Sequence, residues 1–331
     1  MDAATSSALV ISRFGDPSEV LELQTRPLPA PGPGELRLRM KFAPINPADL
    51  NLIEGTYGIK PPLPAVCGNE GLGVVEAIGA GVTGWSIGDR VIPPGGTGTW
   101  QEFALAPADR VFRAPEGTSD EFASMLYVNP PTAWCMLHDF VALQPGDWII
   151  QNAATSAVGR CVIQIARALG WKTLSVVRRP EVIAELTALG GDAVVVEDPA
   201  LPKRLKEITG GAPIRLALNA VGGDSAGTLA KCLTQGGQLV TYGAMSKQPL
   251  KLANGLLIFN DLHCHGFWLT RRYQQRPRFE TEVIYDRLGE LHRAGQLQIP
   301  VEKTFRMAEF QEALRLARQE SRGGKVLLSL A

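Results

Sequence analysis

The sequence predicts an α/β protein with two domains, a Gly- and Pro-rich β domain and a doubly wound parallel sheet. Three observations lead to this prediction. The 331 residues are about twice a usual domain length of roughly 150. The first part of the chain consists of short apolar runs separated by Gly and Pro, whereas from residue 126 apolar segments alternate with amphipathic ones that end in Gly. We therefore expect one domain over residues 1–125 and 300–331 and another over residues 126–299.

Alternation of polar and apolar residues marks the expected strands of the first domain. Residues 35–42 alternate with a period of two, as a half-buried strand does. Residues 71–82 and 88–94 are apolar runs with Gly at their ends, and residues 100–106 form another expected strand. Tight turns between such strands are typical of a β-barrel-like domain.

Regular strand–helix alternation predicts the second domain. Its expected strands are continuously apolar, as in a parallel sheet with helices on both faces. They cover residues 148–153, 172–177, 192–196, 215–222 and 238–243, and the expected helices cover residues 156–170, 180–190, 202–210 and 223–237. This order predicts a Rossmann-type sheet that binds a dinucleotide. Helices over residues 281–294 and 307–318 and a strand over residues 325–331 end the chain.

Charge and hydropathy exclude two classes of partner. The chain has 33 Lys and Arg against 33 Asp and Glu, which argues against nucleic-acid binding. No apolar run approaches the roughly 20 residues of a spanning helix, so no membrane partner is expected. The N-terminal residues resemble neither a signal nor a transit peptide. We expect a cytoplasmic protein, or a mature mitochondrial matrix form with its targeting segment removed.

The cysteines and histidines predict neither disulfides nor a metal. Five Cys are widely spaced without a CxxC pair, which favours a reducing compartment. Only His263-Cys264-His265 is a cluster, and no third ligand lies near it in the sequence. The simpler interpretation is a strand that leads into the segment GFWLT.

The turn after the first strand of the second domain is the expected phosphate site. It reads NAATSAVG over residues 152–159, so only Gly159 remains of the usual GxGxxG pattern. Thr155 and Ser156 would cap the helix whether or not a phosphate binds there. The second strand ends in Arg178 and Arg179 with no preceding acid, which favours the 2′-phosphate of NADPH. The alternative is two arginines that merely end a strand at the surface.

The motifs together resemble the medium-chain dehydrogenase/reductase superfamily over essentially the whole chain. The resemblance is carried by residues 68–91, residues 144–154 and the βα units that follow. Zinc alcohol dehydrogenases of this superfamily have Cys and His ligands, with one His in a Gly-His-Glu triplet. Here the triplet is Gly68-Asn69-Glu70, and the segment 45–49, where a Cys would fall, contains none. The sequence is therefore expected to belong to a zinc-free branch.

Within this branch the chain resembles the 2-enoyl thioester reductases of the mitochondrial trans-2-enoyl-CoA reductase type. Eight strings in the same order carry the resemblance: INPADLNLIEGTYG, LPAVCGNEG, GTGTW, VNPPTAW, IQNAATSAVG, ALNAVGG, VTYGAMSKQP and LIFNDLHCHGFWLT. The resemblance implies a GroES-like β-barrel-type catalytic domain beside the Rossmann-type domain. It also implies NADPH-dependent reduction of trans-2-enoyl thioesters, with hydride added to Cβ and a proton to Cα.

The resemblance also implies the site residues. Tyr57, in the loop Gly55-Thr56-Tyr57-Gly58, would donate the proton, since a Tyr with a pKa near ~10 stays protonated at neutral pH. The implied cofactor contacts are Asn129, Thr155, Ser156, Ala157, Val158, Arg178, Arg179, Tyr242, Gly243, Ala244, Met245, Phe267, Trp268, Leu269 and Lys325. Residues 267–269 are expected as a strand beside the nicotinamide and the acyl cleft, with plain core packing as the alternative. Asn46 and Asn69 would orient the substrate carbonyl or cap turns.

Two other functions remain open at this stage. A zinc-free quinone oxidoreductase would share the fold and the cofactor, although the turn at residues 152–159 is poorer in Gly than expected there. A non-catalytic NADPH-binding protein would have no need for the Tyr57 loop. The expected partners are an acyl thioester of CoA or of acyl-carrier protein, and a second subunit that pairs with the late strand to form a homodimer.

Overall fold

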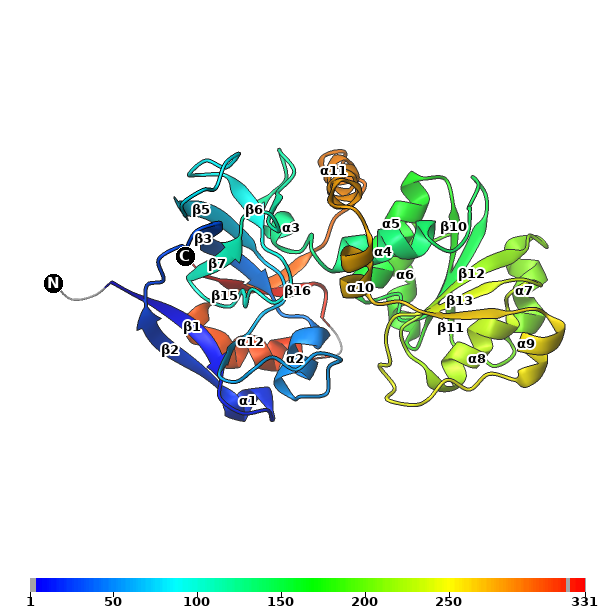
Figure 1. Ribbon diagram of the computed structural model, residues 1–331. Coiled ribbons are helices and arrows are strands. Elements are labelled where there is room, and N and C mark those ends of the chain that lie inside the picture. Colours follow the sequence, from blue (N-terminus) through cyan, green and yellow to red (C-terminus); the bar gives the residue numbers. More distant parts are fainter. Residues whose placement is uncertain (1–3, 320–321, 331) are drawn as a thin grey trace. The chain divides into compact units, whose positions relative to one another are not determined.

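The structure, a computed structural model, describes residues 4–319 and 322–330 and divides into two compact units (Figure 1). The first unit comprises Met1–Val128, Arg278–Gly289 and Ile299–Ala331. The second unit comprises Asn129–Pro277 and Glu290–Gln298. The expected α/β class is confirmed, because one unit is mainly β-sheet and the other contains a parallel sheet with helices.

Two sheets build the first unit. One runs in the order β2-β1-β4, and the other runs β15-β16-β3-β5-β6-β8 with β7 paired to β3. The strands are β1 (Thr5–Ile11), β2 (Leu21–Pro27), β3 (Glu35–Pro44), β4 (Ala65–Val66), β5 (Leu72–Ile78), β6 (Arg90–Ile92), β7 (Phe103–Pro107), β8 (Phe112–Arg113), β15 (Val301–Arg306) and β16 (Lys325–Ser329). Most pairs are antiparallel.

Strand β3 shows how the sequence builds the core of this unit. Leu36, Leu38 and Met40 are fully buried, while Arg39 between them is exposed. This period of two was predicted over residues 35–42 and is confirmed. The helices of the unit are α1 (Pro17–Val20), α2 (Pro47–Ile53), α3 (Asp120–Ser124) and α12 (Phe310–Ala317), with the 3₁₀ turn η2 (Met307–Glu309) before α12.

Helix α11 (Arg278–Arg293) groups mostly with the first unit. The expected division of the chain placed residues 278–289 in the second domain instead. Two contacts account for the difference. The Tyr285 ring packs edge-on against Phe112 at 5.3 Å, and the Arg278 guanidinium donates hydrogen bonds to the carbonyls of Asp109 and Val111.

The second unit contains a six-stranded parallel sheet in the order β11-β10-β9-β12-β13-β14. Its strands are β9 (Trp148–Gln151), β10 (Lys172–Val177), β11 (Ala193–Val196), β12 (Ile214–Asn219), β13 (Gln238–Thr241) and β14 (His263–Gly266). The strand order reverses between β9 and β12, as it does in a Rossmann-type sheet. The predicted doubly wound sheet is therefore confirmed.

Helices cover both faces of this sheet (Figure 1). They are α4 (Asn129–His138), α5 (Ala157–Ala168), α6 (Ile183–Leu189), α7 (Leu201–Thr209), α8 (Gly223–Lys231), α9 (Asn254–Phe259) and α10 (Leu269–Gln275), with the 3₁₀ turn η1 (Pro180–Val182) before α6. Ile150 and Leu239 pack against Leu229 of α8 on one face, while Val177 packs with Ile163 of α5 on the other. Burial on both faces explains why these strands are continuously apolar.

One predicted strand is wrong. Residues 267–269 were expected in a strand, but β14 ends at Gly266 and Leu269 begins helix α10. Arg272 of α10 and Arg276, directly after the helix, both pair with the Asp139 carboxylate, which is 13% exposed, and these ion pairs hold the helix where the strand was expected. The His263-Cys264-His265 cluster does lie in β14, and the two rings stack 6.4 Å apart.

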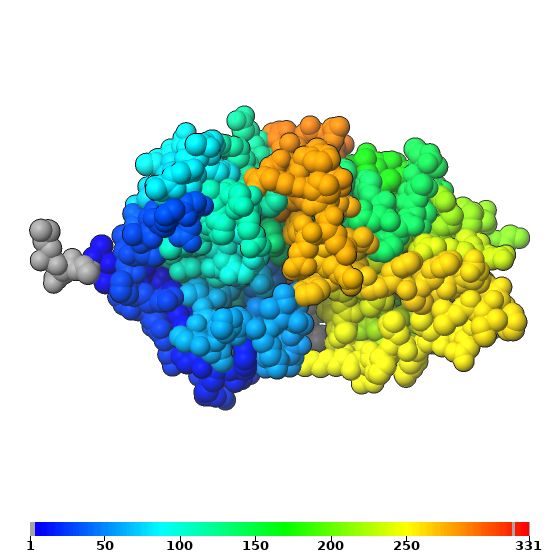
Figure 2. All heavy atoms as spheres, in the orientation of Figure 1, coloured from blue at the N-terminus to red at the C-terminus, as the bar shows by residue number. Residues whose placement is uncertain are grey.

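The edge of the sheet beside β14 is open in the part of the chain that the structure describes. Strand β14 pairs with β13 alone. Ile258 and Phe259 of the neighbouring helix α9 are 68% and 79% exposed. Figure 2 shows the yellow segment that contains α9 lying open on the face drawn. Among the described residues, no helix combines the length and the apolar character that crossing a bilayer requires.

Candidate active site

The loop that carries Tyr57 leaves the C-terminal end of helix α2. The backbone N–H groups of Thr56 and Tyr57 both donate to the carbonyl of Asn51, at 2.9 and 3.1 Å. Gly55 has a φ of +73°, and a side chain there would lie 3.0 Å from Phe14. The turn therefore requires glycine at this position, and it holds Tyr57 half-buried in the first unit. The catalytic role of Tyr57 stays a prediction.

Tyr127 is a second phenol near Tyr57, and no sequence motif pointed to it. Burial raises the pKa of Tyr127, the Gly95 backbone and the charge of Arg110 oppose the shift, and the nearby charge of Glu70 adds to it. Its hydroxyl lies beside Gly95, where a Cβ would be only 2.8 Å from the oxygen. The first unit thus places two tyrosines and a buried carboxylate in one neighbourhood.

Asn69 is held by the carboxylate of Asp49. Its backbone N–H and its side-chain amide both donate to Asp49 Oδ1, at 2.9 and 2.8 Å. The other carboxylate oxygen of Asp49 accepts the backbone N–H of Asn46 at 2.7 Å, at the start of α2. Of the two roles left open by the sequence, this geometry favours the structural one for Asn69.

Asn46 bridges a carboxylate and an ammonium. Its side-chain amide donates to Glu70 Oε1 at 2.7 Å, and its carbonyl oxygen accepts from Lys325 Nζ. Lys325 also donates to the carbonyl of Ile45 at 3.2 Å and is only 8% exposed. The family resemblance implies that Lys325 contacts the cofactor, which stays a prediction. In the structure its ammonium lies within this buried network. Asn46 likewise has a structural role.

The residues around the Gly68-Asn69-Glu70 triplet do not fit a zinc ion. The amide of Asn69 stands where a His ligand would be needed, and it is already bound to Asp49. Burial raises the pKa of the neighbouring Cys67 thiol to about 12, so the thiolate that zinc requires is disfavoured. Among residues 4–319 and 322–330, no three His, Cys, Asp or Glu side chains are grouped so as to hold a metal.

The turn between β9 and α5 is the candidate phosphate site of the second unit. Ser156 caps the helix, with its hydroxyl accepting the N–H of Gly159 at 3.1 Å. A Cβ on Gly159 would lie 2.6 Å from Cα of Ala154 and 2.7 Å from the carbonyl of Ala153. Gly159 therefore allows the close contact between strand turn and helix, which is one role of glycine in this type of turn. The N–H groups at the start of α5 fit an anion.

Two buried asparagines join the turns after β9 and β12, where the strand order reverses. Asn152 donates to Asn219 Oδ1 at 2.8 Å and to the hydroxyl of Ser225 at 3.0 Å. Asn219 Oδ1 also accepts the N–H groups of Val221 and Gly222, at 3.2 and 3.0 Å. These residues were not selected from the sequence, although Asn152 directly follows β9 and Asn219 is the last residue of β12. They fix the crevice in which such sheets bind a cofactor.

The structure brings most of the predicted cofactor contacts to one edge of the second unit. Because all six strands are parallel, their carboxyl ends lie at the same edge. This edge carries Thr155, Ser156, Ala157 and Val158 after β9, Arg178 and Arg179 after β10, Tyr242, Gly243, Ala244 and Met245 after β13, and Phe267, Trp268 and Leu269 after β14. Asn129 lies apart in sequence, at the start of α4 and 7% exposed. Tyr57 and Lys325 belong to the first unit.

The two arginines expected at the 2′-phosphate differ in exposure. Arg178 is exposed directly after β10, and Arg179 is half-buried before the turn η1. Phe267 and Leu269 are buried at 6% and 8% exposure, whereas Trp268 is 40% exposed. The ring centroids of Phe267 and Phe140 lie 6.3 Å apart, so core packing accounts for at least part of the environment of Phe267. Helix N-terminus, arginines and crevice together fit a phosphorylated dinucleotide.

Family models match the chain over both units. The Alcohol dehydrogenase GroES-like domain matches residues 32–116, and the Zinc-binding dehydrogenase domain matches residues 157–284. Mitochondrial enoyl-[acyl-carrier-protein] reductases are similar over nearly all of the chain. The protein from Dictyostelium discoideum is 39% identical, covering 99% of this chain and 95% of its own, and the protein from Rattus norvegicus is 43% identical, covering 93% and 84%.

Solved structures agree in fold. A putative NADPH:quinone reductase from Bacillus thuringiensis has a TM-score of 0.92 at 30% identity, covering 99% of both chains. The mitochondrial 2-enoyl thioester reductase Etr1p/Etr2p heterodimer from Candida tropicalis has a TM-score of 0.89 at 32% identity, covering 98% of this chain and 100% of that one. An Etr1p complex with NADP and crotonyl-CoA has a TM-score of 0.88 at 31% identity, covering 98% and 100%.

Fold and family models together define the class, a medium-chain dehydrogenase/reductase without a zinc site in the described residues. Within this class, the extent and level of identity to the curated relatives place the chain more narrowly. It belongs to the family of 2-enoyl thioester reductases.

Proposed function

We propose that this protein reduces trans-2-enoyl thioesters to saturated acyl thioesters with NADPH. The curated relatives are named enoyl-[acyl-carrier-protein] reductases and are 39% and 43% identical to the chain. The Etr1p structure contains NADP and crotonyl-CoA, which are the cofactor and a substrate of this class. The observation that carries the proposal is Tyr57, held after α2 by two backbone hydrogen bonds in a family of this activity.

The first unit supplies the proton in this reaction. NADPH, when bound, supplies the hydride that is added to Cβ. Tyr57 donates its phenolic proton to Cα, and a Tyr suits this task because it is protonated at neutral pH. Tyr57 is half-buried, and the two hydrogen bonds of the turn fix the backbone to which its ring is attached. Positioned proton donors of this kind contribute about 10²–10⁴-fold to a rate.

The second unit would hold the cofactor. The N-terminal turn of α5, from Ser156 to Val158, offers backbone N–H groups to the pyrophosphate. Arg178 and Arg179 would bind the 2′-phosphate, which only NADPH carries. The loop 242–245 and residues 267–269 would contact the nicotinamide side.

Quinone reduction is the second candidate function, because the Bacillus thuringiensis neighbour has a TM-score of 0.92. A mycobacterial quinone oxidoreductase is also similar, at 26% identity and a TM-score of 0.87. Neither gives a reason to expect a proton-donating Tyr57. NADPH oxidation followed at saturating crotonyl-CoA and, in parallel, with a simple quinone separates the two. We expect turnover with crotonyl-CoA; turnover of the quinone alone would overturn the proposal, and no turnover of either would favour a non-catalytic NADPH-binding protein.

The substrate carrier and the assembly form a further part of the proposal. The acyl group would be carried by CoA or by acyl-carrier protein, the carrier in the relatives' names. The open edge of β14 and the exposed side chains of α9 support a homodimer, whereas Etr1p/Etr2p is named a heterodimer. The curated relatives are named as mitochondrial, so we propose the mitochondrial matrix or the cytoplasm as the location of this protein.

A further inference from the structure

Two buried carboxylates of the first unit, Asp49 and Glu70, have no role in the proposed chemistry, and they share one polar network with the buried ammonium of Lys325. Asp49, Glu70 and Lys325 are 2%, 0% and 8% exposed. Burying charges costs several kcal/mol per ion in order of magnitude, and the mutual attraction rarely returns more than that. Burial accordingly raises the pKa of Asp49 to about 6, and it raises the pKa of Glu70 as well. Their presence therefore calls for a use other than stability.

Glu70 is the hub of this network. One carboxylate oxygen accepts the side-chain amide of Asn46 at 2.7 Å, and the other accepts the backbone N–H of Val128 at 2.7 Å. Its own carbonyl accepts the hydroxyl of Thr99 at 2.7 Å. Lys325 balances its charge and donates to the same Asn46. Glu70 thus fixes the residue that begins helix α2 and the backbone next to Tyr127.

Hydrogen bonds at the two ends of helix α2 connect Asn46 to Tyr57. The N–H of Asn46 is held by Asp49, one turn into the helix, and Asp49 is held in turn by Asn69. At the other end of the helix, the carbonyl of Asn51 accepts the N–H of Tyr57. Helix α2 has only seven residues, so a rotation at its start is passed on to its end.

We propose that Glu70 is a positioning residue for Tyr57, acting through Asn46 and helix α2. The inference rests on the proposed function, because it assumes that Tyr57 donates the proton. Proton transfer requires donor and acceptor in close register, and a displacement of about 1 Å can cost 10²-fold in rate. A buried carboxylate that accepts two hydrogen bonds from different segments supplies such a constraint.

The first experiment is Glu70→Gln, which keeps the shape and removes the charge. With crotonyl-CoA and NADPH, we expect kcat to fall about 10- to 100-fold. The KM for crotonyl-CoA and the Kd for NADPH, measured by fluorescence titration, should stay within about threefold, because Glu70 touches neither in the proposed role. An unchanged kcat would overturn the inference.

A double-mutant cycle with Tyr57→Phe separates positioning from general damage. If Glu70 acts through the phenolic hydroxyl, Glu70→Gln should change kcat by less than about twofold once that hydroxyl is gone. An equal loss in both backgrounds would contradict the inference and leave the proposed function intact. Absence of crotonyl-CoA turnover in the unmodified protein would overturn both.

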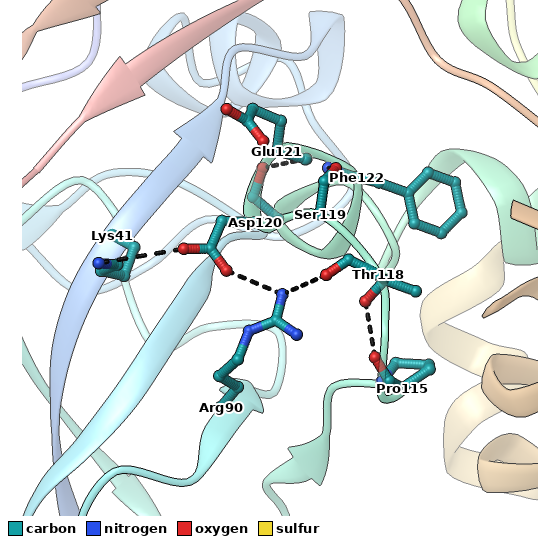
Figure 3. A network of polar contacts seen from close by, with 9 residues as sticks. Lys41, Arg90, Pro115, Thr118, Ser119, Asp120, Glu121 and Phe122 are labelled. Carbon is teal, nitrogen blue, oxygen red and sulfur yellow. Dashed lines mark hydrogen bonds and ion pairs between the residues drawn. The ribbon is translucent and has the colours of Figure 1, made fainter. Parts of the chain in front are cut away.

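The control is another polar network of the same unit, around Asp120 (Figure 3). There Asp120 pairs with Arg90 at 2.8 Å and with Lys41 at 3.9 Å, and Arg90 also donates to the carbonyl of Thr118 at 2.9 Å. Asp120→Asn should lower kcat by less than about twofold, since surface and partly exposed ion pairs contribute little. A loss equal to that of Glu70→Gln would overturn the inference.

A milder variant decides the matter if Glu70→Gln does not fold, as judged by circular dichroism. Asn69→Ala removes the single side-chain hydrogen bond to Asp49, at 2.8 Å, and leaves all three charges in place. We expect a loss in kcat of about threefold or more, absent again in the Tyr57→Phe background. A kcat equal to that of the unmodified protein would count against the network as a positioning device.

Discussion

At the scale of single residues, the backbone of neighbouring residues sets the position of Tyr57. Gly55 permits the turn at a φ of +73°, and Asn51 accepts the hydrogen bonds that define it. Asn69, which stands where zinc relatives have a His, instead holds Asp49. A polar network thus occupies this part of the first unit, and the proposed proton donor is the phenol of Tyr57.

Replacing Tyr57 by Phe tests the proton donor. The change removes one hydroxyl from a half-buried ring, so folding should be unaffected. We expect kcat with crotonyl-CoA to fall about 10²- to 10⁴-fold, the usual contribution of a general acid, while NADPH binding is retained. Stopped-flow NADPH oxidation measures the rate. A variant as fast as the unmodified protein would remove Tyr57 from the mechanism.

Asp49 makes stability depend on pH in an unusual direction. Burial raises the pKa of its carboxyl from 3.8 to about 6, although hydrogen bonds and Lys325 oppose the shift. Because the folded pKa lies above the unfolded one, the stability due to this group is present below about pH 4 and is lost as pH rises through about 6. The shift corresponds to about 3 kcal/mol in order of magnitude.

Comparison with Asp49→Asn isolates this effect, because the other carboxyls titrate in both proteins. We expect the free energy of unfolding of the unmodified protein, relative to the variant, to decrease by up to about 3 kcal/mol between about pH 4 and pH 7. Urea titrations at several pH values measure the difference. A difference that does not change with pH would show that burial leaves the pKa of Asp49 unshifted.

At the scale of elements, the turn from β9 to α5 shows how a weak motif can mark a well-defined position. Only Gly159 remains of the glycine pattern, yet Ser156 caps the helix, and a Cβ on Gly159 would lie within 2.8 Å of backbone atoms. The position of the turn was predictable because an apolar strand precedes it and an amphipathic helix follows it. Asn152 and Asn219, which join the turns at 2.8 Å, were not predictable, since one sequence does not reveal which loops meet.

Gly159→Val tests this turn. A side chain there would overlap the backbone of Ala153 and Ala154, and overpacking costs about 1–3 kcal/mol. We expect a lower melting temperature and weaker NADPH binding. Gly266→Ala is the control, because its Cβ would meet nothing within 4 Å and its φ is not positive. Equal melting temperatures for both variants would show that the turn tolerates a side chain.

The wrong prediction of a strand at residues 267–269 has a physical cause. The segment GFWLT is apolar and aromatic, which favours a strand. The structure ends β14 at Gly266, and Arg272 of α10 and Arg276, directly after it, pair with Asp139. Local propensity gave way to ion pairs between residues more than 130 positions apart, which no local pattern contains. Phe267, Trp268 and Leu269 nevertheless follow the carboxyl end of a parallel strand, as the predicted site requires.

At the scale of the whole molecule, the order of elements was predicted well because regular alternation fixes a doubly wound sheet. The sequence did not predict that residues 278–289 group with the first unit. This grouping depends on contacts of Arg278 and Tyr285 with β8 and the residues before it, which are distant in sequence. The buried network around Glu70 was not predictable from the sequence either, because its residues come together only in the folded chain. A buried carboxylate is indistinguishable from a surface one in sequence.

Assembly is the prediction that belongs to this scale. The free edge of β14 exposes unpaired backbone groups, and Ile258 and Phe259 beside it are 68% and 79% exposed. We expect a homodimer through this edge, so light scattering should give twice the chain mass of 35.6 kDa. Ile258→Asp with Phe259→Asp should shift the mass toward one chain. A single-chain mass for the unmodified protein would refute the dimer.

The destination of hydrogen tests the central claim most directly. Crotonyl-CoA is reduced with NADPH deuterated at the nicotinamide C4 position in ordinary water, and in a second reaction with ordinary NADPH in D₂O. NMR of the butyryl product locates the deuterium. The proposed reaction predicts deuterium at Cβ in the first reaction and at Cα in the second. Deuterium from the cofactor at Cα, or no butyryl thioester in either reaction, would contradict enoyl thioester reduction by hydride addition to Cβ.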